Sequence, residues 1–286
     1  MPVNYSSIPP LDAAAVLKRY GLRADKKLGQ NFLQDPFALE KIANAAEIQA
    51  DDCVLEVGPG LGSLTRYLAL SARKVAAVEL DPELIRPLKA ILTPHPNVAV
   101  VHGDILDLSV SELVDQPGYV VAANIPYNIT SAIIRRLLES EPKPRRMVLT
   151  IQKEVAERIC AKPGDLSLLA LSVQVYGSPR IEAKIPASAF HPIPNVDSAI
   201  LRVDIYDQPL IPRETLAAFF KLVKAGFGQK RKTLRNSLSA GLHTKPGEAE
   251  EMLKSAGVDP MRRAETLSIE EWGRLCEWQC RRPFDE

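Results

Sequence analysis

The sequence predicts an α/β fold: a mostly parallel sheet flanked by helices, followed by a small all-helical domain at the C-terminus. Between residues 53 and 160, short apolar runs alternate with segments of helical periodicity, as in parallel sheets whose strands are joined by helical crossovers. A glycine-rich turn follows the first apolar run. After Ile205 only helical periodicity remains.

The N-terminal part, up to about residue 50, is expected to be a helical lead-in. Apolar residues recur at helical spacing over residues 11–20. Asp35-Pro36 is typical of a helix start, because the carboxylate can cap free backbone N–H groups and proline fits the first turn. Asp81-Pro82 predicts the start of a later helix for the same reason.

Five buried runs are expected to form the sheet, at residues 53–57, 75–78, 98–101, 120–123 and 147–151. Helices are expected between or after them at residues 64–70, from 82 onward, 131–138 and 154–160. The carboxyl ends of parallel strands meet at one edge of a sheet, where open α/β sheets bind ligands. Polar residues that follow these strands are therefore candidate site residues.

The C-terminal part begins with a predicted linker at residues 208–212, which contains two prolines. Helices are expected at residues 215–225, 230–240, 248–256 and 269–280. Ser268 and Glu271 have the spacing of a capping box at the start of the last helix. We therefore expect a sheet-containing domain over residues 1–207 and a helical domain over residues 208–286.

Composition narrows the class of protein. The 286 residues carry a formal net charge of +1, so nucleic-acid binding would require local clusters of charge. The four cysteines form no CxxC pair and have no histidines at zinc spacing, which predicts free thiols, a reducing cytosol and no metal site. No apolar run approaches the roughly 18 residues of a membrane span. Because the first ten residues also lack a signal pattern, we expect a cytoplasmic protein.

Asn124-Ile125-Pro126-Tyr127 follows the fourth predicted strand and is poor core material. The Asn side-chain oxygen and a neighbouring backbone carbonyl could accept both hydrogens of an exocyclic amine such as adenine N6. The Tyr ring could stack on the base. A β-turn with proline at its second position explains the same residues equally well.

The glycine-rich turn runs from Glu56 to Ser63, and acidic residues follow the next two strands. Gly58 opens a backbone turn that can approach a ligand closely, but Ser63 replaces the last glycine of the dinucleotide-binding pattern. The turn instead resembles motif I of class I, Rossmann-like methyltransferases, which bind S-adenosylmethionine. Glu79 could then accept both ribose hydroxyls and Asp104 the adenine amine, although a helix cap and a turn are the simpler alternatives.

Motifs along almost the whole chain resemble one family, the small-subunit (16S) ribosomal RNA adenine N6,N6-dimethyltransferases of the KsgA/RsmA type. The matching segments are residues 27–33 (KLGQNFL), 124–127 (NIPY), 190–198 (FHPIPNVDS), 227–236 (FGQKRKTLRN) and 263–268 (RAETLS). One loop departs from the family pattern. It reads Gly164-Asp165-Leu166-Ser167 where many relatives carry Tyr-Gly, so its RNA contacts are uncertain.

The resemblance implies roles for particular residues. Asn31, Leu33, Gly58, Glu79, Asp104 and Asn124 would bind S-adenosylmethionine. Asn124 and the Pro126 carbonyl would accept the amine hydrogens of the target adenosine, and Tyr127 and Phe190 would sandwich its base. No metal is needed. The resemblance further implies two adjacent target adenosines near the 3′ end of the RNA, within a small-subunit assembly intermediate; we expect a monomer.

RNA contacts are expected from a local excess of positive charge. Residues 221–236 contain no acidic residue, and basic side chains bind phosphates. A solvated basic helix, balanced by the acidic segment 248–251, would look the same. The residues expected to bind RNA are Lys221, Lys224, Lys230, Arg231, Lys232 and Arg235, with Arg145 and Arg146 as an extension.

Two alternative functions remain at this point. One is a large-subunit RNA adenine methyltransferase of the macrolide-resistance type, which the basic 227–236 segment disfavours. The other is a ribosome-assembly or transcription factor that keeps the fold without turnover. The intact Asn124, Pro126, Tyr127 and Glu79 disfavour it.

Overall fold

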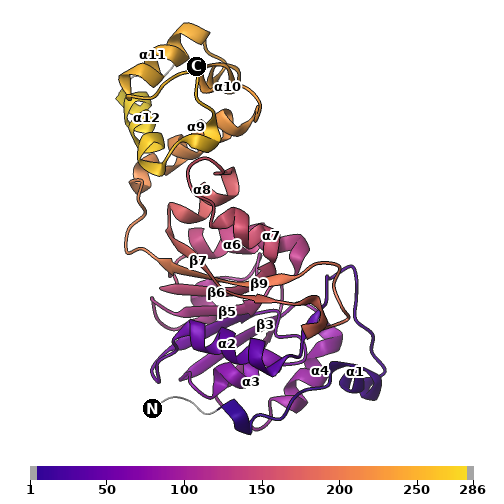
Figure 1. Ribbon diagram of the computed structural model, residues 1–286. Helices are drawn as coiled ribbons and strands as arrows, with labels where there is room; N and C mark the ends of the chain where they lie inside the picture. The colour runs from indigo at the N-terminus through magenta and orange to yellow at the C-terminus, as the bar shows by residue number, and fades with distance from the viewer. Residues whose placement is uncertain (1–4, 282–286) are drawn as a thin grey trace. The chain divides into compact units, whose positions relative to one another are not determined.

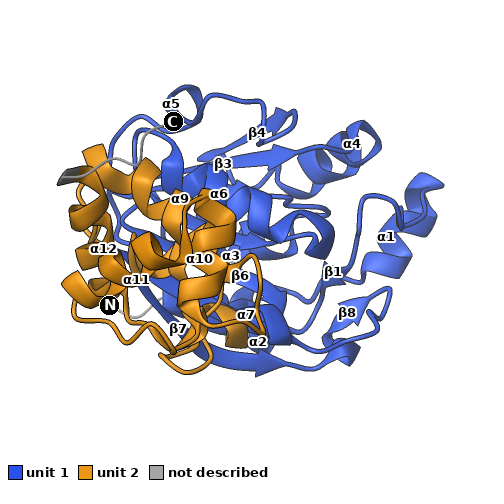
Figure 2. Cartoon of the chain, turned by 90° about the horizontal axis from the view of Figure 1, so that it is seen from above, with its two compact units in different colours: residues 1–156, 178–205 blue, residues 157–177, 206–286 orange. Residues whose placement is uncertain are grey.

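The computed structural model describes residues 5–281, which form two compact units (Figure 2). Unit 1 comprises the chain up to residue 156 together with residues 178–205. Unit 2 comprises residues 157–177 and the chain from residue 206 onward. Residues 157–177 therefore group with the C-terminal helices, although they precede the predicted linker.

Unit 1 is built on a seven-stranded sheet in the order β4-β3-β2-β5-β6-β9-β7. The five predicted strands are confirmed, and neighbours among them pair in parallel. β9 joins antiparallel to β6. The strands are β2 (Cys53–Val57), β3 (Lys74–Glu79), β4 (Val98–His102), β5 (Val120–Asn124), β6 (Arg146–Gln152), β7 (Gly177–Ile185) and β9 (Ser198–Ile205).

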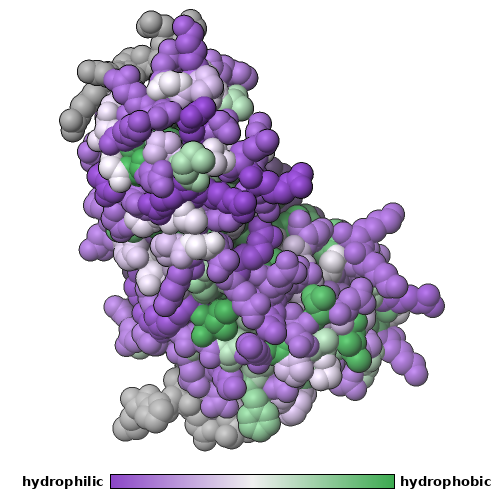
Figure 3. Space-filling view, turned by 45° about the horizontal axis from the view of Figure 1, so that its top comes forward, coloured by the Kyte–Doolittle hydropathy of each residue, from purple (hydrophilic) through white to green (hydrophobic). Residues whose placement is uncertain are grey.

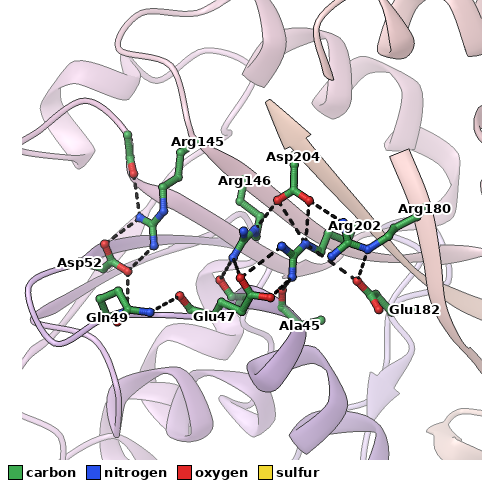
Figure 4. A network of polar contacts seen from close by, with 12 residues as sticks. Ala45, Glu47, Gln49, Asp52, Arg145, Arg146, Arg180, Glu182, Arg202 and Asp204 are labelled. Atoms are coloured by element: carbon green, nitrogen blue, oxygen red, sulfur yellow. Dashed lines mark hydrogen bonds and ion pairs between the residues drawn. The ribbon is translucent and has the colours of Figure 1, made fainter. Parts of the chain in front are cut away.

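The sequence analysis did not predict β7 and β9, because charged residues interrupt both. In β9 the Arg202 side chain is 7% exposed and donates to Glu47 at 2.5 Å and to Asp204 at 3.0 Å. Arg146 contacts the same two carboxylates, as Figure 4 shows. Burial alone would raise the pKa of Asp204, but hydrogen bonds from Arg202 and Arg146 lower it overall. The network satisfies the buried charges and joins the end of α2 (Pro36–Ala46) to the sheet.

Helices cover both faces of the sheet: α2 and α3 (Ser63–Ala69) lie on one side and α6 (Thr130–Glu139) on the other (Figure 1). The predicted caps are confirmed, since Asp35 accepts from Ala38 N and Asp81 from Glu83 N. A separate antiparallel pair, β1 (Phe32–Leu33) and β8 (Phe190–His191), was not predicted. The remaining helices of unit 1 are α1 (Ala13–Tyr20), α4 (Pro82–Ile91) and α5 (Val110–Leu113).

The described part of unit 2 consists mainly of helices joined by loops and short 3-10 turns. α7 (Lys153–Ile159) leads into it, and α8 (Leu168–Gln174), α9 (Leu216–Phe227), α10 (Leu234–Leu242), α11 (Pro246–Ser255) and α12 (Ile269–Arg281) follow. The helix predicted from residue 230 begins only at Leu234, because residues 229–232 form a turn and Thr233 is extended. The basic run 230–232 therefore lies in a connection and not on a helix.

The surface is mainly polar in the view of Figure 3, where small hydrophobic patches are separated by hydrophilic residues. Most large apolar side chains are packed inside, with Leu55 in the sheet and Trp272 in unit 2 fully buried. None of the helices in residues 5–281 is long and apolar enough to cross a membrane.

Candidate active site

A cavity of about 190 Å³ opens in unit 1 at the carboxyl ends of β2, β3, β4 and β5, the predicted edge of the sheet. Its walls come from the lead-in segment 27–33, the glycine-rich turn, the ends of β3 and β4, and residues 124–129. Eight of the predicted site residues line it together: Asn31, Leu33, Gly58, Glu79, Asp104, Asn124, Pro126 and Tyr127.

Glu79 lies at the end of β3 and is 5% exposed. Its two carboxylate oxygens accept from Gly60 N and Asp81 N, each at 2.9 Å. Burial raises the pKa of Glu79 above its usual value, although these backbone hydrogen bonds act to lower it. Since each carboxylate oxygen can accept more than one hydrogen bond, the side chain can still accept hydroxyl groups of a ligand.

The glycine-rich turn approaches the lead-in segment closely at Gly60. Its φ is +58°, and a Cβ there would lie 2.9 Å from the Phe32 ring. Only glycine satisfies both constraints without displacing β1. Gln30, which the sequence analysis left without a role, donates to Asp81 at 2.7 Å and so ties this segment to the end of β3. Its position next to Asn31 in the KLGQNFL motif was the available signal.

Asn124 is the last residue of β5, and its amide nitrogen donates to the backbone carbonyl of Asn31 at 2.9 Å. This bond determines which end of the carboxamide is the donor. It therefore leaves the side-chain oxygen as an acceptor for a ligand. The two residues are 93 positions apart, so the sequence carried no sign of the contact.

Pro126 and Tyr127 line the cavity and also belong to a tight turn, in which Pro126 is the first residue and not the second as predicted. The Pro126 carbonyl accepts two long bonds, from Ile129 N and Thr130 Oγ1, both at 3.3 Å. The Tyr127 hydroxyl lies 2.6 Å from Ser198 Oγ. Burial raises the pKa of Tyr127, and the bond to Ser198 opposes it. Ser198 ends the FHPIPNVDS motif, but no role was predicted for it.

Phe190 lies elsewhere than predicted. Its side chain is 2% exposed and packs in the apolar core, and it does not line the cavity. The reason is the pairing of β8 with β1, which sets Phe190 opposite Leu33. Stacking on a base would require the ring to leave the core.

Two more acidic groups face the cavity. Asp104 accepts from Leu106 N at 2.9 Å through one oxygen, as in a turn. Glu56 is 1% exposed, and its Oε2 has no hydrogen-bond partner among residues 5–281. Burial and, to a smaller extent, the Glu79 carboxylate raise the pKa of Glu56 to about 8. These carboxylate acceptors fit S-adenosylmethionine, which offers an ammonium group, ribose hydroxyls and an adenine amine as donors.

The predicted RNA-binding residues fall into two groups. Arg145 and Arg146 lie at the amino end of β6, at the sheet edge opposite the cavity, and pair with carboxylates there. In unit 2, Arg235 pairs with Glu250 at 3.3 Å. The other five side chains are exposed, and the described residues place no carboxylate within ion-pair distance of them: Lys221, Lys224, Lys230, Arg231 and Lys232.

A sequence model of the ribosomal RNA adenine dimethylases matches residues 21–280. The chain belongs to this family. The ribosomal RNA small subunit methyltransferase A of Dehalococcoides mccartyi (strain CBDB1) is 46% identical over 279 residues, which cover 96% of each chain. The protein of the same name from Alkaliphilus oremlandii is 42% identical and covers 93% of this chain and 95% of its own.

Solved structures of other RNA methyltransferases share the fold of this dimethylase-family chain. A dimethyladenosine transferase from Plasmodium falciparum superposes with a TM-score of 0.75 at 26% identity, covering 87% of this chain and 98% of its own. The 23S ribosomal RNA methyltransferase ErmE superposes with a TM-score of 0.70 at 34% identity, covering 87% of this chain and 99% of its own. The predicted α/β methyltransferase fold is therefore confirmed.

Proposed function

We propose that this chain transfers methyl groups from S-adenosylmethionine to N6 of two adjacent adenosines near the 3′ end of small-subunit (16S) ribosomal RNA. The product is N6,N6-dimethyladenosine, formed while the small subunit is being assembled. The observation that carries the proposal is the orientation of Asn124, whose oxygen is left as an acceptor at the cavity. Family membership and the small-subunit relatives support the choice of substrate.

S-adenosylmethionine supplies a methyl group on a positively charged sulfur, which is already electrophilic, so we propose no metal. Glu79 would accept the ribose hydroxyls and Asp104 the adenine amine of the cofactor. The unpartnered Glu56 oxygen would accept from its ammonium group. Asn31, Leu33 and Gly58 would contact the rest of the molecule from the lead-in segment and the glycine-rich turn.

Asn124 would hold the target amine. Its side-chain oxygen accepts one N–H, which favours a pyramidal nitrogen with a localised lone pair. The Pro126 carbonyl would accept the other N–H. It is the weaker acceptor of the two, because Ile129 N and Thr130 Oγ1 already donate to it. The Tyr127 ring, held through its hydroxyl by Ser198, would stack on the unstacked base. After the first transfer only one N–H remains, and the Asn124 oxygen is sufficient to accept it.

RNA would be bound by the five unpaired basic side chains at residues 221–232 of unit 2, since the ion pairs of Arg145 and Arg146 give those residues a structural role. The proposed partner is the RNA of a small-subunit assembly intermediate, and we propose that the chain acts as a monomer.

The experiment is transfer of labelled methyl groups to small ribosomal subunits that lack the modification, followed by nucleoside analysis. Dimethyladenosine approaching two per particle is expected. Label on large-subunit RNA instead, located by primer extension, would favour the activity named for ErmE, to which this chain is structurally similar. Tight RNA binding without label on either would favour a non-catalytic factor.

Variants separate the role of the site from that of the fold. Asn124→Ala is expected to lower the transfer rate by roughly 100-fold or more, as when a positioned polar group of an active site is removed. Tyr127→Ala is expected to lose more activity than Tyr127→Phe, which keeps the stacking ring. Full transfer by Asn124→Ala would rule out the proposed amine acceptor.

A further inference from the structure

A second cavity, of about 500 Å³, lies entirely within unit 2. One wall comprises Asp165, Leu166 and Ser167, from the loop 164–167 that departs from the family pattern, and the first two residues of α8. Another is the end of α9 and the residues that follow it. No role has been assigned to this cavity so far.

The apolar residues that line the cavity include Phe227 and Leu168. Phe227 closes α9 and is stacked on Trp272 with ring centroids 6.1 Å apart, which holds its ring in place. Leu168 contributes an aliphatic side chain that is 37% exposed, a rare exposure for leucine in this protein. A planar, partly apolar group such as a nucleobase suits such walls, because bases stack on aromatic rings whatever their sequence.

Three cations also line the cavity: Arg158 on α7, Lys224 on α9 and Lys230 beyond its end. The cavity also contains the acids Asp165 and Glu265, so its formal charge is +1. Lys224 and Lys230 belong to the acid-free segment 221–236. A phosphate next to the cavity would therefore meet a net positive field.

The loop wall is a defined structure. The Glu265 backbone carbonyl accepts from Gly164 N at 2.9 Å and from Leu166 N at 3.2 Å. The Glu265 carboxylate also lies 3.9 Å from Arg263, which reduces its repulsion of a phosphate. These backbone bonds hold residues 164–166 next to Glu265, which also lines the cavity.

We propose that this cavity binds one unpaired nucleotide of the RNA substrate, with its base against Phe227 and Leu168 and its phosphates near Arg158, Lys224 and Lys230. The inference rests on the proposed function, because it assumes an RNA substrate. It adds a base-binding site separate from the methyl-transfer cavity. The protein would thus select RNA that presents an unpaired nucleotide in addition to the target adenosine.

The test compares two RNA hairpins: one carries a single unpaired 2-aminopurine, and the other lacks this unpaired base. The fluorescence of 2-aminopurine changes when the base stacks. The full chain is expected to bind the hairpin with the unpaired base about ten-fold more tightly, the order of magnitude for stacking one base. Leu168→Ser and Phe227→Ala should abolish both this preference and the fluorescence change. Leu168→Ser covers the possibility that Phe227→Ala destabilises the fold through the loss of Trp272 packing.

Two controls locate the bound base. Tyr127→Ala alters the methyl-transfer cavity, so a preference that survives in Tyr127→Ala but not in Leu168→Ser supports the proposal. The opposite pattern, or equal affinity of the unmodified protein for both hairpins, would overturn it. Lys221→Ala, a change outside the cavity, should weaken the binding of both hairpins equally. Failure to bind either hairpin, together with absence of methyl transfer, would instead contradict the proposed function.

Discussion

Buried acidic side chains determine how the site responds to pH at the scale of single residues. Glu56 and Glu79 lie in the same cavity, and burial raises the pKa of both, that of Glu56 to about 8. The folded protein therefore keeps a proton on Glu56 at a pH at which the unfolded chain has released it. A cationic ligand against the unpartnered Glu56 oxygen would favour the charged form.

Glu56→Gln should flatten the dependence of stability on pH. In the native protein the free energy of unfolding falls as pH rises from about 4.5 to about 8, with a slope of about 1.4 kcal/mol per pH unit from this proton. The amide cannot titrate, so the variant lacks this part of the slope. Urea unfolding at several pH values measures it. Glu112→Gln is the same change at an exposed position and should keep the native slope. If the curves of unfolding free energy against pH were parallel for Glu56→Gln and the native protein, the assignment of this proton to Glu56 would be wrong.

At the scale of elements, the site depends on how the lead-in segment packs over the glycine-rich turn. β1 is only two residues long, yet it brings Phe32 against Gly60 and Asn31 against Asn124. Pairing with β8 holds it in place, which explains why Phe190 is a core residue. The lead-in segment thus lines the candidate active site and is not only a helical extension.

Gly60→Ala should lower both stability and affinity for S-adenosylmethionine. The left-handed backbone costs any residue with a Cβ roughly 1–2 kcal/mol, and here the Phe32 ring must also move. Gly118→Ala is a matched control, because its φ is +73° and a Cβ would meet nothing within 4 Å. Urea unfolding should show the larger loss for Gly60→Ala, and calorimetry should show weaker cofactor binding only there. Equal losses in the two variants would mean that the contact with Phe32 is unimportant.

At the scale of the whole molecule, the distribution of charge matters more than its sum. The net charge is +1, yet the acid-free segment 221–236 lies in unit 2, whereas Arg146 and Arg202 of unit 1 are held in ion pairs. The buried guanidinium group of Arg202 is compensated by its partners Glu47 and Asp204 and is not available to RNA. Exposed, unpaired side chains such as Lys230 are available to phosphates.

Replacing Lys230, Arg231 and Lys232 together by alanine should reduce the salt dependence of RNA binding. Each phosphate contact adds roughly 0.7–0.9 to the slope of log affinity against log salt concentration, so the slope should become smaller by about two to three. Binding titrations between low and moderate salt measure it. Lys254→Ala is the control and should leave the slope unchanged, because this lysine is paired with Glu250 at 2.7 Å. An unchanged slope in the triple variant would exclude Lys230, Arg231 and Lys232 from the RNA interface.

The sequence by itself determined the parallel strands, the helix caps and the cavity residues that follow strands. These follow from local periodicity and from the convergence of parallel strands at one edge, as for Glu79 and Asn124. Asn31 and Leu33 were identified only through the family resemblance of their motif. The tertiary structure alone decided which end of the Asn124 carboxamide is the acceptor, because its partner lies 93 residues away. It also placed Phe190 in the core and Arg202 within a strand, since long-range pairing decides whether a ring is covered and whether a buried charge is compensated.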